Sequence, residues 1–263
     1  MPTAERGSRR IHFESTGEGP AVILVPGLGA GSKLFGTLPR RFERAGFRCI
    51  SFDPVGVPPS SAHQGAYDLE EAGRDLLAVA ENAGLDRFDL LGTSLGGKVA
   101  LVTANLAPER IRRLVLLASS VVSTPRSRRI YRFFEILANR LQPAELAEAM
   151  AAFLFGRSFQ QKRPRVVADL VGSMHLDAAA RALMIAQTRC LQAFDGATIA
   201  AKVTCPTLCL AGGEDTLTGP DEIRASAEQI PNARFELVPK AGHSLLLEAA
   251  EVLSTTLDFL QAD

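Results

Sequence analysis

Short apolar runs alternate with amphipathic segments along most of the chain. The first strong run is Ala21-Val-Ile-Leu-Val25, and apolar positions at helical spacing follow between residues 34 and 45. Similar apolar runs predict further strands at 47–52, 87–91, 113–118, 207–211 and 234–238. Uninterrupted apolar strands alternating with helices are typical of a parallel sheet that is covered on both faces. The pattern therefore predicts an α/β fold.

Local signals refine the ends of these elements. Residues 11–15 and the turn at 16–20 predict a hairpin that leads into the strand at 21–25. Asp68 is the predicted N-cap of a helix, with Glu71 as its capping-box partner. A last amphipathic helix is predicted at 245–260.

The alternation is interrupted once, between residues 119 and 197. This stretch has no clear strand, only helix-like segments separated by proline and glycine. A chain of 263 residues is longer than a minimal one-sheet domain requires. We therefore predict a core domain formed by residues 1–118 and 198–263, with residues 119–197 as a helical cap insertion.

Charge and composition exclude several classes of partner. The 29 Lys and Arg residues balance the 29 Asp and Glu residues, so no basic field favours nucleic acid or a membrane surface. No apolar stretch reaches the roughly 18 residues that a membrane span needs, and the first ten residues do not resemble a secretory signal. Four scattered cysteines predict small buried side chains in a reducing compartment, namely Cys49, Cys190, Cys205 and Cys209. We expect a cytoplasmic protein, a monomer or a homodimer.

The segment Gly92-Thr93-Ser94-Leu95-Gly96 has the form G-x-S-x-G between a predicted strand and a predicted helix. A sharp turn there lifts the serine hydroxyl above the sheet edge, and only small residues fit beside it. The start of the following helix places the Leu95 N–H where negative charge develops on an attacked carbonyl. Ser94 is therefore the candidate nucleophile.

A nucleophilic serine needs a base, and the base needs an orienting acid. His243 follows the strand at 234–238 and would lie on a loop at the same edge of the sheet as Ser94. Solvated side chains are expected for the other histidines, His12, His63 and His175. Glu214 and Asp215 follow the strand at 207–211 at that edge, and both are candidate acids.

A second oxyanion donor is predicted in Pro26-Gly27-Leu28-Gly29, where the Leu28 N–H would point to the same place as the Leu95 N–H. The competing interpretation is a phosphate-binding loop. It fits poorly, because G-x-G-x-x-G requires a glycine where Ser32 stands.

Taken together, these residues resemble the α/β-hydrolase superfamily over nearly the whole chain. The resemblance rests on five segments: 25–29, 53–60, 92–97, 212–215 and 241–243. It implies an α/β-hydrolase fold, selects Asp215 over Glu214 as the acid, and implies that residues 119–197 form a cap over the active site. Dehalogenases and epoxide hydrolases of this superfamily carry aspartate at the elbow, so the resemblance with a serine there argues against those two activities for this chain.

Two departures from the superfamily pattern concern the substrate. Pro26-Gly27 stands where many relatives have His-Gly, and Val55 and Pro58 replace the arginine and second glycine of D-x-R-G-x-G-x-S. Both loops help to shape the substrate site, so the substrate class of relatives that share the arginine does not transfer directly.

The expected function is hydrolysis of a small, fairly apolar carboxylic ester or lactone by Ser94, Asp215 and His243, without metal or organic cofactor. The alternatives on the same residues are C–C bond hydrolysis, perhydrolysis, acyl transfer, or ligand binding with slow turnover. Phenylalanine and methionine residues in the insertion predict either cap packing or an apolar pocket. Arg126, Arg128, Arg129 and Arg132 predict a solvated basic helix face or a site for an anionic group. The insertion carries eleven basic and six acidic residues.

Overall fold

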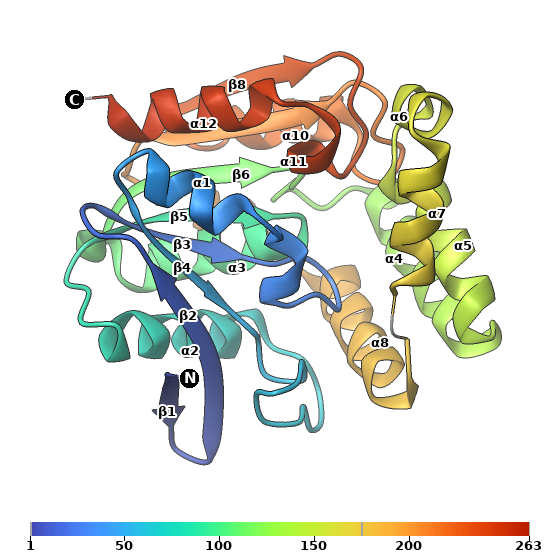
Figure 1. The fold of residues 1–263 in the computed structure, drawn as a ribbon, viewed down its shortest axis with the longest axis horizontal. Coiled ribbons are helices and arrows are strands. Elements are labelled where there is room, and N and C mark those ends of the chain that lie inside the picture. The colour runs from blue at the N-terminus through green and yellow to red at the C-terminus, as the bar shows by residue number, and fades with distance from the viewer. Residues whose placement is uncertain (1, 175, 263) are drawn as a thin grey trace.

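The computed structural model describes residues 2–174 and 176–262. In this part of the chain the strands form one eight-stranded sheet in the order β1-β2-β4-β3-β5-β6-β7-β8 (Figure 1). β1 (Thr3–Arg6) pairs antiparallel with β2 (Arg9–Thr16), which pairs antiparallel with β4. All further pairings are parallel, and they join β3 (Ala21–Val25), β4 (Arg48–Phe52), β5 (Phe88–Thr93), β6 (Ile111–Leu117), β7 (Thr207–Gly212) and β8 (Ala233–Val238). The predicted mostly parallel sheet is confirmed.

Helices cover both faces of this sheet. One face packs against α2 (Leu69–Asn82), α3 (Leu95–Leu106), α9 (Ala197–Ala200) and α10 (Pro220–Ala227). The other packs against α1 (Leu38–Arg44), α11 (Leu245–Glu248) and α12 (Glu251–Gln261). Every residue of β3 is buried, because alternate side chains enter the cores on opposite faces.

Several elements differ from the sequence-based expectation. The predicted hairpin into β3 is wrong, since β2 pairs with β1 and β4 instead. The helix predicted at 34–45 is divided into η1 (Ser32–Phe35) and α1 because Gly36 between them has a φ of +47°. The final helix is likewise divided into α11 and α12. η2 (Pro108–Arg110), β1 and α10 were not predicted.

Asp68 caps α2 as predicted, with its side chain accepting from the N–H groups of Glu70 and Glu71. The Glu71 carboxylate does not complete a capping box. It is instead 2.7 Å from Arg6 of β1, so this carboxylate joins the helix to the edge of the sheet.

Between β6 and β7 the described residues form helices and no strand. Apart from α9, these are α4 (Pro125–Arg140), α5 (Pro143–Leu154), α6 (Arg157–Lys162), α7 (Pro164–Gly172) and α8 (Ala178–Ala193), which we call the cap helices. The arrowheads of β6 and β8 point toward them in Figure 1. They therefore lie at the carboxyl edge of the sheet. The division into a core and a cap at residues 119 and 197 stays a prediction.

Three of the four cysteines, Cys49, Cys205 and Cys209, are buried, and Cys190 is half-buried. Burial raises the pKa of the Cys205 thiol to about 11. Packing inside the core therefore fits the three buried thiols, whereas the compartment of the protein stays a prediction. Within the described residues no helix is long and apolar enough to cross a membrane.

A buried carboxylate joins α4 to α8. Glu135 accepts hydrogen bonds from Arg189 at 2.9 Å, Gln192 at 2.9 Å and Arg132 at 3.0 Å. The hydrogen bonds from Gln192 and Arg189 lower the pKa of Glu135 to about 2. An unfolded glutamate has a pKa of about 4.3. The charged carboxylate therefore stabilises the cap fully above that pH, and the stabilisation is lost as the pH falls toward 2.

We expect Glu135→Gln to lower the melting temperature at pH 7 by roughly 3–6 °C, because hydrogen bonds to a charged group contribute about 1–2 kcal/mol. The difference from wild type should shrink below about pH 4. Thermal unfolding followed by circular dichroism between pH 3 and 7 measures both effects. Glu148→Gln, at an exposed position of α5, is the matched control. Equal melting temperatures of the two variants at pH 7 would contradict the assigned role.

Candidate active site

Ser94 occupies the turn between β5 and α3 in a strained backbone conformation, with φ 55° and ψ −119°. Its N–H donates to the Leu117 carbonyl at 2.9 Å, and the Ser119 hydroxyl donates to its carbonyl at 2.8 Å. A Cβ at Gly92 would lie 2.4 Å from the Gly96 oxygen, and one at Gly96 would lie 2.2 Å from the Val25 oxygen. Both glycines of the G-x-S-x-G segment are therefore required by close backbone contacts.

Two backbone N–H groups are available beside Ser94. Leu95 is the first residue of α3, and the loop after β3 approaches from the other side. A Cβ on Gly27 of this loop would be 3.5 Å from the Ser94 Cβ. Among the described residues, neither the Leu28 nor the Leu95 N–H has a protein hydrogen-bond acceptor. Both predicted donors thus have free N–H groups, and Leu95 follows Ser94 directly whereas Leu28 follows Gly27, which packs against Ser94.

The loops after β7 and β8 bring Asp215 and His243 together. His243 Nδ1 is 2.8 Å from Asp215 Oδ2, and both side chains are buried. The other carboxylate oxygen, Oδ1, accepts from the N–H groups of Leu217 at 2.8 Å and Thr218 at 2.9 Å. Because both oxygens have partners, the carboxylate is fixed and orients the imidazole ring.

Glu214, the other candidate acid, binds a different part of the molecule. Its oxygens accept from the Ser158 N–H and hydroxyl on α6, each at 2.6 Å. These hydrogen bonds lower the pKa of Glu214. The acid that contacts His243 is therefore Asp215.

The structure does not join all three predicted residues directly. In the part of the chain that is described, no hydrogen bond links the Ser94 hydroxyl to the His243 ring. Catalytic hydrogen bonds are often long without substrate and tighten when it binds. Ser94 is half-buried, so its hydroxyl is within reach of a ligand.

Two other histidines have defined partners. The expectation of a solvated His12 is wrong, because its ring is buried and Nδ1 is 2.8 Å from Asp53 Oδ2. Asp53 Oδ1 accepts from the Ser32 N–H at 2.8 Å, which holds the chain just after the Leu28 loop. His63, half-buried, bonds the Gly65 carbonyl at 3.0 Å. His175 lies outside the described residues.

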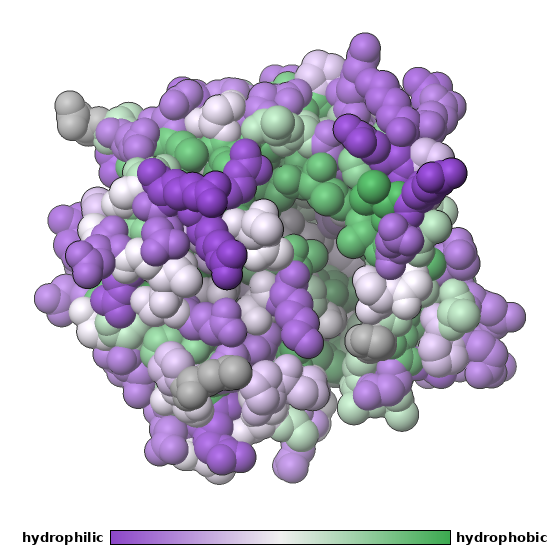
Figure 2. Space-filling model, viewed as in Figure 1, coloured by the Kyte–Doolittle hydropathy of each residue, from purple (hydrophilic) through white to green (hydrophobic). Residues whose placement is uncertain are grey.

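Apolar side chains of the cap helices pack over this site. Leu28 and Leu217 both pack against a cluster that contains Phe134, Met150 and Met184. Leu217 follows Asp215 by two residues. Figure 2 shows a hollow between the core and the cap helices with hydrophobic residues around it. Phe134, Met150 and Met184 therefore contribute both to cap packing and to the apolar surroundings of the site, whereas Phe155, Phe159 and Met174 belong to a separate cluster within the cap.

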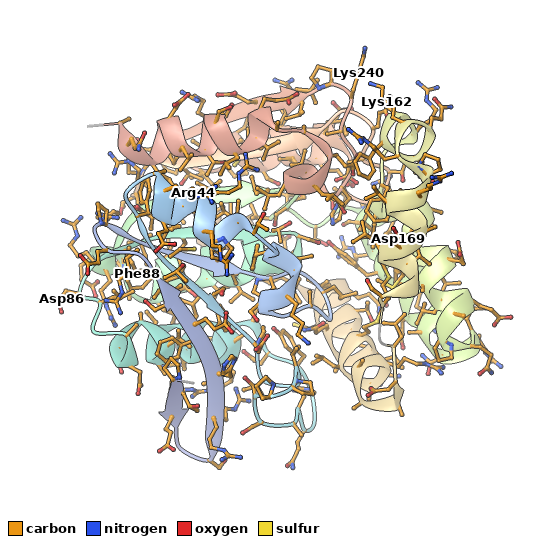
Figure 3. All side chains as sticks on the ribbon, viewed as in Figure 1. Arg44, Asp86, Phe88, Lys162, Asp169 and Lys240 are labelled. Atoms are coloured by element: carbon orange, nitrogen blue, oxygen red, sulfur yellow. The ribbon has the colours of Figure 1, made fainter. Side chains whose placement is uncertain are left out.

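The basic residues of the cap face mainly outward. In α4, Arg126 is 3.0 Å from Glu222 and Arg132 is 3.0 Å from Glu135, and all four arginines of the run are exposed. Lys162 on α6 and Lys240 before His243 also extend into solvent (Figure 3). This agrees with a solvated basic face rather than a cluster directed into the site.

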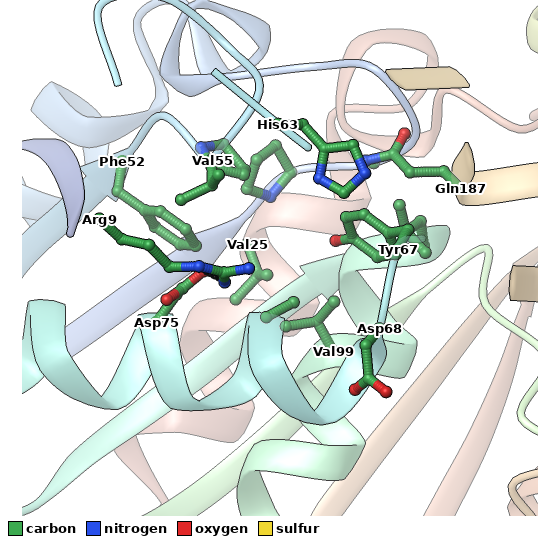
Figure 4. Close-up of a pocket in the computed structure, with 15 residues that line it drawn as sticks. Arg9, Val25, Phe52, Val55, His63, Tyr67, Asp68, Asp75, Val99 and Gln187 are labelled. Carbon is green, nitrogen blue, oxygen red and sulfur yellow. Dashed lines mark hydrogen bonds and ion pairs between the residues drawn. The ribbon is translucent and has the colours of Figure 1, made fainter. Parts of the chain in front are cut away.

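Gln187 of α8 was not predicted from the sequence. It is 2% exposed, and its Oε1 accepts from the Gly29 N–H at 2.8 Å. Gln187 and Tyr67 line a pocket behind the Leu28 loop (Figure 4), where burial raises the pKa of the Tyr67 hydroxyl. One polar residue in an amphipathic helix carries no signal in the sequence that it binds a loop 158 positions away.

The described residues hold no group of three or more histidine, cysteine or acidic side chains arranged for a metal ion. A model of the α/β hydrolase fold family matches residues 20–250. The chain belongs to this family.

Relatives of this α/β hydrolase are similar over nearly its whole length. A protein of Variovorax paradoxus (strain S110) named "Putative carbamate hydrolase RutD" is 29% identical, and the match covers 95% of this chain and 96% of the relative. A thermophilic esterase from Thermogutta terrifontis, solved with malate bound, is 26% identical with a TM-score of 0.84, covering 98% of this chain and 95% of that one. The enol-lactonase from Burkholderia xenovorans LB400 has a TM-score of 0.88 at 22% identity, and the match covers 99% of this chain and 100% of that one. This similarity shows the shared fold.

We expect Asp215→Asn to lower kcat by on the order of 10³–10⁴, because the amide would favour the wrong imidazole tautomer. Glu214→Gln should lower kcat less than about tenfold, since the amide oxygen can still accept from Ser158. Steady-state hydrolysis of an activated ester measures both values. A larger loss for Glu214→Gln than for Asp215→Asn would assign the acid to Glu214.

Proposed function

We propose that this α/β hydrolase is a serine hydrolase that cleaves a small, fairly apolar carboxylic ester or lactone through an acyl-enzyme. The observation that carries the proposal is the buried Asp215–His243 contact of 2.8 Å at the sheet edge that also bears Ser94. A buried His–Asp pair beside a strained serine and two unpaired N–H groups matches the requirements of acyl transfer.

Each residue has a separate role in the proposed reaction. Ser94 Oγ attacks the carbonyl carbon while His243 Nε2 accepts its proton, and Asp215 stabilises the imidazolium. The N–H groups of Leu28 and Leu95 bind the oxyanion. His243 then protonates the leaving alcohol, and water, deprotonated by His243, releases the acid from Ser94.

The apolar cluster over Leu28 and Leu217 supports an apolar acyl or alcohol group in the substrate. The similarity to an esterase at 26% identity also supports an ester substrate. The similarity to a protein named as a carbamate hydrolase, at 29% identity, favours a carbamate as the second candidate. The same residues would attack a carbamate carbonyl.

We expect Ser94→Ala to lower kcat by on the order of 10⁴ or more and to abolish labelling by a fluorophosphonate, because the alanine cannot form the covalent intermediate. Mass spectrometry of the labelled wild type should place the adduct on Ser94. Thermal unfolding of Ser94→Ala controls for folding. Labelling at another residue, or near-wild-type turnover by Ser94→Ala, would refute the proposal.

A substrate series separates the candidate reactions. We expect kcat/KM to rise by roughly tenfold or more from acetate to butyrate esters, because about 0.8 kcal/mol is gained for each buried CH₂. The series includes lactones, an aryl carbamate, a ring-fission diketone, and halide with peroxide. Preference for the carbamate or the diketone would replace the ester assignment. Tight binding without a burst of product would instead indicate a slow-turnover binding protein.

A further inference from the structure

The loop that carries His243 lies directly against the α5–α6 junction of the cap. A Cβ on Gly242 would be only 2.1 Å from the Gly156 nitrogen, so the two backbones are in close contact. The Ser244 N–H donates to the Leu154 carbonyl at 2.9 Å. The residues on both sides of His243 thus touch a segment about 90 positions earlier in the sequence.

The Glu248 side chain joins these two backbones. Its Oε2 accepts from the Gly242 N–H at 2.7 Å and from the Gly156 N–H at 3.0 Å. Its Oε1 accepts from the Ser244 N–H at 3.2 Å. One carboxylate therefore binds the N–H groups on either side of His243 and one N–H of the cap.

Three backbone donors at one carboxylate form a strong, charge-assisted arrangement. The pKa of Glu248 is raised, because the effect of burial is larger than the opposite effect of the hydrogen bonds from Gly242 and Gly156. On the acid side, Glu214 binds Ser158, two residues after Gly156. The same short cap segment thus contacts the loops of both Asp215 and His243.

We propose that Glu248 is a positioning residue that fixes the His243 loop against Gly156 and thereby makes the position of the cap part of the alignment of the base. The inference rests on the proposed function, since it assigns to His243 the role of general base. Displacement of a catalytic group by about 1 Å can lower the rate by roughly 10²-fold. The effect should therefore fall on kcat more than on KM.

Two glycines of the cap provide a matched test. Gly156 has φ −64° and ψ 150°, which alanine adopts readily. Its Cβ would lie 2.7 Å from the Gly242 nitrogen and 2.9 Å from both Glu248 Oε2 and Glu214 Oε2, so the Glu248 variants described below separate the two carboxylates. A Cβ on Gly172, at the end of α7, would meet nothing within 4 Å. Gly156→Ala therefore perturbs the contact, and Gly172→Ala changes only the cap elsewhere.

We expect Gly156→Ala to lower kcat for an activated ester by roughly 10- to 100-fold at 25 °C, with KM changed less than about threefold. The kcat of Gly172→Ala should stay within about twofold of the wild-type value. The rate of fluorophosphonate labelling should follow kcat. Labelling of wild-type Ser94 tests the proposed function. The ratio of the kcat values of the two glycine variants tests Glu248 and its contacts. Equal kcat values for folded Gly156→Ala and Gly172→Ala would overturn the inference.

Variants of Glu248 test the same contact if Gly156→Ala does not fold. Glu248→Ala should lower kcat by roughly 10- to 100-fold, and Glu248→Gln should recover most of this loss because its amide oxygen can accept from Gly242 and Gly156. Glu251→Ala, at an exposed position of α12, is the control. A role limited to stability would lower the melting temperature of Glu248→Ala and leave kcat of the folded protein unchanged. That result would also overturn the inference.

Discussion

The close packing of the turn at Ser94 is the constraint on which the rest of the site depends. The turn fits between the ends of β3 and α3 only because Gly92 and Gly96 lack side chains. The left-handed conformation of Ser94 costs about 1–3 kcal/mol, and it persists because the surrounding structure determines it. Hydrogen bonds to Leu117 and from Ser119 hold the strained residue on both sides.

The same packing sets the position of the loop that carries Leu28, one of the two predicted oxyanion donors. Since Gly96 touches the carbonyl of Val25, the chain leaving β3 must pass beside the turn. Gly27 consequently lies against Ser94, and Leu28 is the next residue of the chain. Asp53 and Gln187 then hold the residues that follow, at Ser32 and Gly29. The strained serine and the position of the loop that follows β3 thus have one common origin in the contact of β3 with α3.

The sequence predicts the parts of this arrangement that depend on local patterns. Strand β3 is predicted at its observed ends, since its five residues are apolar and buried on both faces. Ser94, Asp215 and His243 could be placed at one sheet edge because each follows a parallel strand. The residues alone do not show which of Glu214 and Asp215 contacts the histidine, since adjacent residues on a loop differ only in the direction in which their side chains point. Their different partners, Ser158 and His243, lie on distant segments.

Long-range polar contacts were the least predictable feature. His12 looked like a solvated residue in a hairpin, yet the order of the strands places β2 beside β4 and brings its ring to Asp53. Gln187 and Glu248 each bind backbone N–H groups, which any residue can offer except proline. Backbone donors leave no residue-type signature, so neither contact could be inferred from spacing. Sequence patterns thus predict which elements form, whereas burial between elements decides which polar groups meet.

The cap helices bind the loops around Ser94 and His243 through several contacts, and two of them are side chains that accept backbone N–H groups. Gln187 of α8 binds the Leu28 loop, and Gly156 at the α5–α6 junction binds the His243 loop through Glu248. Moving α8 away from the core would release the Gly29 N–H, and moving the α5–α6 junction would release the N–H of Gly156 from Glu248. In either case a buried polar group would lose its partner, at a cost of roughly 1–3 kcal/mol. The position of the cap helices and the order of the Leu28 and His243 loops are therefore energetically linked. Because α5 and α8 also carry residues of the apolar cluster, a substrate that fits the cluster would stabilise the closed arrangement in which both loops are held.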